Sequence, residues 1–117
     1  MPPPQQQVPF LTVEDEDDWV LSFAFGPRGE NRLTLRRTPR LEFMLRPEQR
    51  GVFVGAGAGT RPAPLVAVQW GARSVDVVST ERRYSLDISK VDGNVLAAAL
   101  QVLGKMNFDQ RFQLAGV

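Results

Sequence analysis

The sequence predicts an α+β, mainly β fold: an antiparallel meander sheet or partly open barrel of six to eight strands with one C-terminal helix. Short segments that alternate apolar and polar residues recur from Val8 to Ser89, with turn-forming residues between them. The connections are too short for the crossovers that parallel strands need, so the strands are expected to be antiparallel. Beyond Ser89 the apolar spacing changes to three and four residues, which is typical of a helix with one apolar face.

Four strands are expected in the first half of the chain, at 8–13, 19–25, 32–37 and 40–46. The glycine- and proline-containing stretch 26–31 predicts the turn of a hairpin. In the fourth segment, Leu41, Phe43 and Leu45 alternate with polar residues or methionine, so these three side chains are expected to face the core.

Four more strands are expected at 52–54, 65–70, 73–79 and 84–89. The irregular stretch 55–64 lies between the first two and is rich in glycine and proline. Its GxGxG spacing lacks the third glycine of a dinucleotide-binding loop, and Pro62 and Pro64 prevent a helix from starting there. We therefore expect a linker here, not a phosphate-binding loop.

A helix is expected after Ser89, with either Ser89 or Asp92 as its N-cap and Gly104 at its end. Aromatic and apolar residues beyond the helix are expected to fold back onto the body of the protein. The apolar face of the helix consists of Val95, Leu96, Ala99, Leu100, Leu103 and Met106, and the residues that fold back are Phe108, Phe112 and Leu114.

Length and composition indicate one globular domain at 8–117, preceded by a disordered, proline- and glutamine-rich tail at 1–7. The net charge of +1 gives no general attraction to nucleic acid or to an anionic membrane. The N-terminus lacks the features of a secretory signal, and no apolar run is long enough for a membrane helix. We expect a cytoplasmic protein without membrane insertion.

The chain contains neither cysteine nor histidine. Thiolate nucleophiles, histidine general bases and the usual ligands of zinc are therefore excluded within it. Nothing in the sequence brings two of the carboxylates Asp15, Asp17, Asp76 and Asp87 together in a pocket. We expect a protein that is not an enzyme and that needs no cofactor or metal.

An acidic run precedes the second expected strand and is the strongest charge feature of the chain. Such a run is stable where solvent screens it or where a basic partner neutralises it, so it is either a solvated turn or a docking site. Trp19 follows at once and could anchor an interface, although tryptophan more often packs in a core. We call the run the acidic lip; it consists of Glu14, Asp15, Glu16, Asp17 and Asp18.

Arginines are concentrated between positions 28 and 50. On alternating strands, four of them would project from the face opposite the core and could bind an anionic ligand or an acidic partner. Guanidinium groups on an exposed sheet face also serve simply to keep it solvated. Stacking aromatics are absent from that face, so binding of single-stranded nucleic acid is not expected. The four arginines are Arg32, Arg36, Arg40 and Arg46.

Several segments of the chain follow one another in a characteristic order. The acidic turn 15–18 leads into a Val-Leu-Ser-Phe-Ala strand at 20–24, and a hairpin leads to Leu-Thr-Leu-Arg-Arg at 33–37. The segments 49–54 and 84–88 follow, and the terminal helix comes after them. This order resembles the small β-rich immunity proteins of bacterial polymorphic toxin systems. The resemblance covers about residues 13–104, while the loop 55–64 and the tail after Gly104 depart from it. It implies a cytoplasmic protein that binds and blocks a cognate toxin.

The sequence therefore predicts a non-enzymatic binding protein, with a cognate toxin as its protein partner and no nucleic acid. Two alternatives remain open. A pleckstrin-homology-like barrel module would bind phospholipid head groups or peptides through its basic strands. A structural subunit of a phage or secretion apparatus would make assembly contacts through its tail. The oligomeric state is left open.

Overall fold

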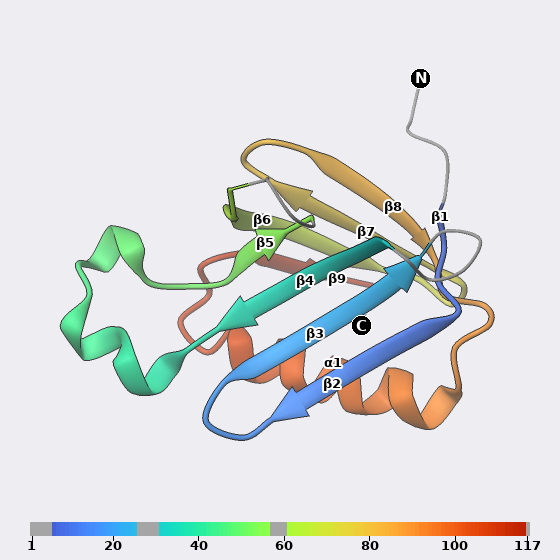
Figure 1. Ribbon diagram of the computed structural model, residues 1–117, viewed down its shortest axis with the longest axis horizontal. Helices are drawn as coiled ribbons and strands as arrows, with labels where there is room; N and C mark the ends of the chain where they lie inside the picture. The colour runs from blue at the N-terminus through green and yellow to red at the C-terminus, as the bar shows by residue number, and fades with distance from the viewer. Residues whose placement is uncertain (1–5, 26–30, 57–60, 117) are drawn as a thin grey trace.

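The computed structural model describes residues 6–25, 31–56 and 61–116. Nine strands form one mostly antiparallel open sheet, and one helix of 14 residues packs against it (Figure 1). Strand accounts for 46% of the described residues and helix for 23%, so the predicted mainly β class is confirmed. The strands are β1 (Gln6–Gln7), β2 (Phe10–Asp15), β3 (Trp19–Phe25), β4 (Asn31–Arg37), β5 (Phe53–Gly55), β6 (Ala63–Trp70), β7 (Ser74–Ser79), β8 (Arg83–Asp87) and β9 (Gln113–Ala115).

The strands from β2 to β8 follow one another across the sheet as a meander. The short strands β1 and β9 are exceptions, since they pair in parallel with β8 and β6. Between β1 and β2 lies Val8, which is fully buried and donates its N–H to the carbonyl of Asp87. The chain thus passes directly from one end of the sheet order to the other, because β1 and β2 are the two terminal strands.

The core lies between the curved sheet and helix α1 (Gly93–Met106), which packs against β2 and β3 (Figure 1). Alternation along the strands supplies the sheet side of this core, with Leu33 and Leu35 of β4 fully buried. The carboxylate of Asp92 accepts a hydrogen bond from the N–H of Asn94 and caps the helix, as expected for one of the two candidates. Gly104 does not end the helix, which continues to Met106.

The prediction of a strand at 40–46 is wrong. This part of the chain forms a 3-10 helix, η1 (Pro39–Met44), and a second one, η2 (Pro47–Gln49), follows. The side chain of Phe43, expected in the core, is 77% exposed, and those of Leu41 and Leu45 are partly exposed. Pro39 and Pro47 begin the two helical turns, where a missing N–H is tolerated. Period-two alternation could not reveal this, because Glu42 is the residue that is buried.

Several other expectations differ in detail. Gln6 and Gln7, expected in the tail, pair with Leu86 and Asp87, while residues 1–5 lie outside the described part of the chain. The predicted turn 26–31 lies outside it except for Asn31. Of the predicted linker 55–64, only 57–60 lie outside it, while Gly55 ends β5 and Ala63 and Pro64 begin β6. Phe112 folds back and is buried, whereas Phe108 is 61% exposed. Within the described residues, no helix has the length and apolar character needed to cross a membrane.

Candidate interaction surface

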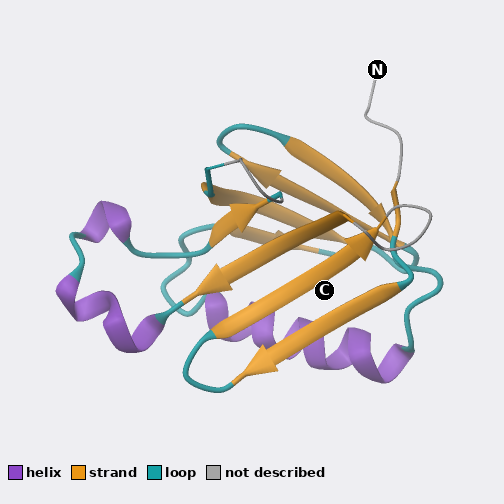
Figure 2. Ribbon diagram, in the orientation of Figure 1, coloured by secondary structure: helices purple, strands orange, loops and turns teal. Residues whose placement is uncertain are grey.

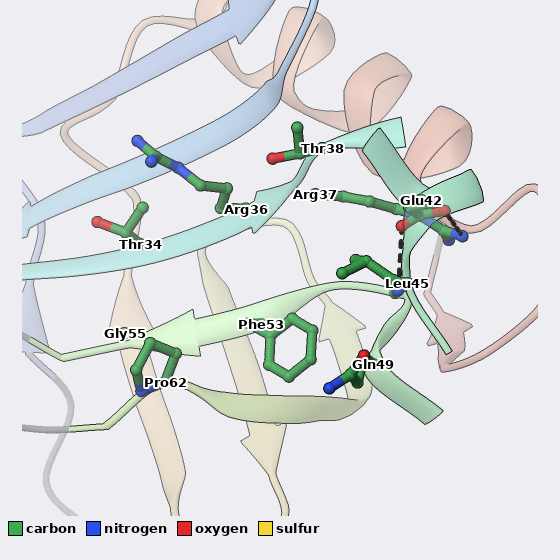
Figure 3. A pocket seen from close by; sticks show the side chains of 11 residues that line it. Thr34, Arg36, Arg37, Thr38, Glu42, Leu45, Gln49, Phe53, Gly55 and Pro62 are labelled. Carbon is green, nitrogen blue, oxygen red and sulfur yellow. Dashed lines mark hydrogen bonds and ion pairs between the residues drawn. The ribbon is translucent and has the colours of Figure 1, made fainter. Parts of the chain in front are cut away.

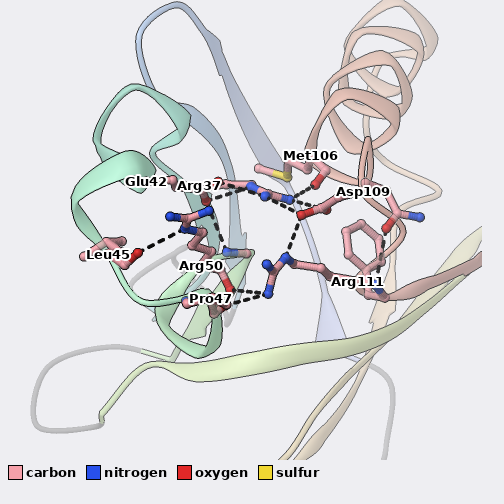
Figure 4. Close-up of polar contacts among 11 residues, drawn as sticks. Arg37, Glu42, Leu45, Pro47, Arg50, Met106, Asp109 and Arg111 are labelled. Atoms are coloured by element: carbon pink, nitrogen blue, oxygen red, sulfur yellow. Dashed lines mark hydrogen bonds and ion pairs between the residues drawn. The ribbon is translucent and has the colours of Figure 1, made fainter.

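A buried arginine connects three parts of the molecule. Arg37, the last residue of β4, occupies the core-facing position after Leu33 and Leu35 and is 1% exposed. Its guanidinium donates two hydrogen bonds of 2.8 Å to Glu42 in η1. Two more, of 2.8 and 2.9 Å, go to Asp109, and a fifth of 2.7 Å goes to the carbonyl of Met106 (Figure 4). All five N–H groups of the guanidinium are therefore used.

These contacts determine the charge states of Arg37, Glu42 and Asp109. The two carboxylates hold Arg37 in its charged form by hydrogen bonds and by coulombic attraction, and its pKa is raised despite the opposing effect of burial. Burial alone would raise the pKa of Glu42, but hydrogen bonds from Arg37 and from the Gly51 N–H lower it overall. Bonds from Arg37 and Arg111 lower the pKa of Asp109 far below its ordinary range. All three groups are ionised at neutral pH.

A second arginine, Arg111, connects Asp109 to the 3-10 helix η2. Its Nε contacts the Asp109 carboxylate at 2.6 Å, and its Nη1 donates to the carbonyl of Pro47 at 2.8 Å. Asp109 thus lies between the two arginines (Figure 4). We call residues 39–50 the anchored segment, because Arg37 holds η1 and Arg111 holds η2. Both 3-10 helices stand apart from the sheet (Figure 2).

Gly51 returns the anchored segment to the sheet with a φ of +113°. A Cβ at this position would lie 3.1 Å from Cδ of Arg111. Residues other than glycine also rarely adopt this backbone conformation. We expect Gly51→Ala to destabilise the protein by about 1–2 kcal/mol, measured by urea unfolding. Gly55→Ala is the control, because its Cβ would meet open space. Equal unfolding free energies for the two variants would contradict the strain at Gly51.

The anchored segment exposes a group of apolar side chains. Phe43 is 77% exposed and Met44 is 64% exposed, although both sit beside the buried Glu42. Large apolar side chains that cluster in a fixed part of the surface are typical of interaction sites. The ion pairs therefore hold an apolar surface in a defined position without burying it.

The acidic lip lies beside this segment at the turn between β2 and β3. Arg40 of η1 contacts the carboxylate of Asp18 at 3.5 Å, which places the lip and the segment together. Asp15 accepts a 2.6 Å hydrogen bond from Lys105 of α1. Among the described residues, the other three lip carboxylates form no ion pair and are exposed to solvent; they are Glu14, Glu16 and Asp17.

Trp19 joins the lip to the end of the helix. It is half-buried and packs edge-to-face against Phe108, with ring centroids 6.3 Å apart. The Phe108 ring in turn lies 4.3 Å from the guanidinium carbon of Arg37. Trp19 thus contacts Arg37 indirectly, through the Phe108 ring. The other tryptophan, Trp70, is buried in the core.

The expected arginine face is only partly present. Arg32 and Arg36 are exposed on the outer face of β4, as predicted. Arg40 and Arg46 are exposed too, but they lie on the anchored segment and do not extend that sheet face. The expected set of four on one face is therefore incorrect, because the segment that carries two of them is not a strand.

Sequence reasoning missed Arg37, Glu42, Asp109 and Arg111 as a group. The one available signal was that Arg37 continues the inward positions of Leu33 and Leu35, where an arginine needs a charged partner. Asp109 is 72 residues away along the chain, so the pairing itself depends on tertiary structure.

The described part of this surface consists of exposed apolar side chains, exposed carboxylates and ion pairs. In the described ranges, no group of three or more Asp or Glu side chains is placed to hold a metal ion. The strongly perturbed pKa values belong to ion pairs that already satisfy one another. No protein-family model, no curated protein and no solved structure matches this chain.

Proposed function

We propose that this chain is a non-enzymatic protein-binding protein that neutralises a cognate toxin, and that the anchored segment and the acidic lip form its contact surface. The observation that carries the proposal is the exposure of Phe43 and Met44 on a segment held by two arginines. The sequence resemblance to immunity proteins supports the choice of a toxin as the partner.

The apolar part of this surface suits a binding hot spot. A few large side chains usually provide most of the affinity of an interface, and they work best when their backbone is already ordered. Arg37 and Arg111 supply that order through Glu42, Asp109 and the carbonyl of Pro47. Little conformational entropy is then lost when the partner binds.

The charged part of the surface suits a basic partner. Glu14, Glu16 and Asp17 are exposed at the turn whose Asp18 contacts Arg40 of the anchored segment, so a positively charged protein would be attracted and oriented. Toxins that act on nucleic acid carry basic clefts, which an acidic lip could occupy. The combination of exposed apolar side chains and exposed carboxylates supports a basic protein as the partner.

The proposal can be tested by co-purification with the full chain from its native host. The partner is then expressed with and without this protein, and growth is measured. We expect the partner to arrest growth when it is alone and growth to resume when both are present. A partner that is harmless alone, or that arrests growth equally in both cases, would contradict the proposal.

One observation favours a second candidate. A meander from β2 to β8 followed by a single helix is also the arrangement of a pleckstrin-homology-like module, and Arg32 and Arg36 are exposed on its outer face. Such a module would sediment with vesicles containing anionic lipid, and replacing both arginines with glutamine would abolish sedimentation. Absence of sedimentation with these vesicles would exclude this candidate.

A further inference from the structure

A groove of about 610 Å³ lies on the outer face of β4 and β5, on the opposite side of these strands from the core. The anchored segment forms one wall of the groove through Leu45 and Gln49, and Pro62 lies at the other end (Figure 3). A volume of this size falls within the range of small-molecule sites. The groove lies apart from Phe43 and Met44, which do not line it.

The lining of the groove is mainly apolar. Phe53 lies opposite Arg36 in the pairing of β5 with β4, and its ring forms the floor of the groove between Leu45 and Pro62. A Cβ on Gly55 would meet no atom within 4 Å, so the floor stays open at this end. An apolar ligand would therefore replace water over Phe53 and gain contact with Leu45.

Among the described residues of the lining, Arg36 carries the one charge that is available to a ligand. Arg37 and Glu42 also line the groove, but they are bonded to each other, and Glu42 accepts a further hydrogen bond from Gly51. The Arg36 side chain is exposed and forms no ion pair with any described residue. Glu14 lies on the same outer face but outside ion-pair distance of Arg36. The groove is thus mainly apolar, with the positive charge of Arg36 at its side.

Polar groups lie on both sides of the apolar floor. Thr34 and Thr38 flank Arg36 on the groove face of β4. The amide oxygen of Gln49 accepts a hydrogen bond from the Arg46 N–H at 3.2 Å, which leaves the amide NH2 as a donor. The Thr34 hydroxyl lies at the same end of the groove as the Arg36 guanidinium, whereas Gln49 lies at the other end beside Leu45 (Figure 3). A hydroxyl donor beside a guanidinium fits an anionic oxygen ligand.

We propose that this groove binds a small apolar carboxylate, with its hydrocarbon body over Phe53 and Leu45 and its carboxylate beside Arg36 and Thr34. The four residue steps from Thr34 to Thr38 span about 13 Å along the strand, which accommodates a chain of medium length. The charge of Arg36 selects an anion over a cation of the same shape. This proposal does not depend on the proposed toxin partner, because ligand binding can be tested with the purified chain alone.

Decanoate and decylammonium, below their micelle concentrations, are suitable probes because they share a chain and differ in charge. Titrations followed by backbone amide shifts of the full chain should give decanoate a dissociation constant of about 0.1–1 mM. Shifts should centre on Phe53 and Thr34. Decylammonium should bind at least about tenfold more weakly. Equal affinity for both probes, or no decanoate binding below 5 mM (about the weak limit of specific binding), would overturn the proposal.

Two variants locate the site. Arg36→Gln should weaken decanoate binding about tenfold, while Arg32→Gln is the matched control, because Arg32 is exposed on the same strand but does not line the groove. Equal loss in both variants would overturn the assignment to this groove. A short acetylated peptide ending in leucine is the third probe. Tighter binding of that peptide than of decanoate would overturn the proposal in favour of a protein C-terminus.

Discussion

Replacing Arg37 with methionine is expected to lower the free energy of unfolding by about 3–5 kcal/mol, the largest stability effect of any single change on this surface. The substitution keeps an unbranched apolar stem but leaves the carboxylates of Glu42 and Asp109 without their shared partner. It also leaves the carbonyl of Met106 without its donor. Urea unfolding at neutral pH measures the loss.

The neighbouring Arg36→Met is the control. Because Arg36 is exposed, its replacement should lower the free energy of unfolding by less than about 0.5 kcal/mol.

The pH dependence of stability provides a second check. The pKa values of Glu42 and Asp109 are lowered in the folded protein, so their stabilisation is present above the unfolded pKa of about 4 and is lost as the pH falls. The difference in the free energy of unfolding between wild type and Arg37→Met should therefore become smaller from pH 7 to about pH 3. A constant difference would contradict an electrostatic role for Arg37.

Replacing Phe43 with aspartate is expected to weaken partner binding by about 30-fold or more, because an exposed aromatic hot spot typically contributes 2 kcal/mol or more. The variant should fold normally, since the side chain is 77% exposed. Calorimetric titration with the purified partner measures the affinity. Phe10→Asp is the matched control: Phe10 is 66% exposed at the end of β2 remote from the acidic lip, and its replacement should leave affinity unchanged. Equal affinities for the two variants would place the interface elsewhere.

The acidic lip should affect the kinetics of binding more than its strength. Changing Glu14, Glu16 and Asp17 to the corresponding amides removes the three lip charges that form no ion pair with described residues. The association rate should then fall and should depend less on salt, because long-range attraction acts mainly on encounter. Glu81→Gln, an exposed carboxylate outside the surface, serves as the control. An unchanged salt dependence would show that the lip is only a solvated turn.

Most of the sheet could be predicted from the sequence because its strands alternate regularly. The segment Trp19–Phe25 was predicted with the observed bounds, and β4 was predicted to within one residue. The same rule failed at 40–46, where alternation of Leu41, Phe43 and Leu45 fits a strand but Pro39 begins a 3-10 helix. A local pattern cannot show that Glu42 in this segment will be buried by an arginine from a neighbouring strand.

The candidate surface was only partly predictable for the same physical reason. The acidic lip and Trp19 are local features, and the structure places them at one turn beside the anchored segment. The ion pairs that define the segment join Arg37 to Asp109 and Arg111 to Pro47, which are far apart in sequence. Sequence alone could show that Arg37 occupies an inward position, but not which carboxylates satisfy it.

The most direct test of the central claim is growth of cells that express the toxin partner together with wild-type protein, Phe43→Asp or Phe10→Asp. Immunoblotting confirms that all three proteins reach the same level. The account predicts that wild type and Phe10→Asp restore growth, whereas Phe43→Asp does not. Full protection by Phe43→Asp would show that the anchored segment is not the surface through which this protein acts.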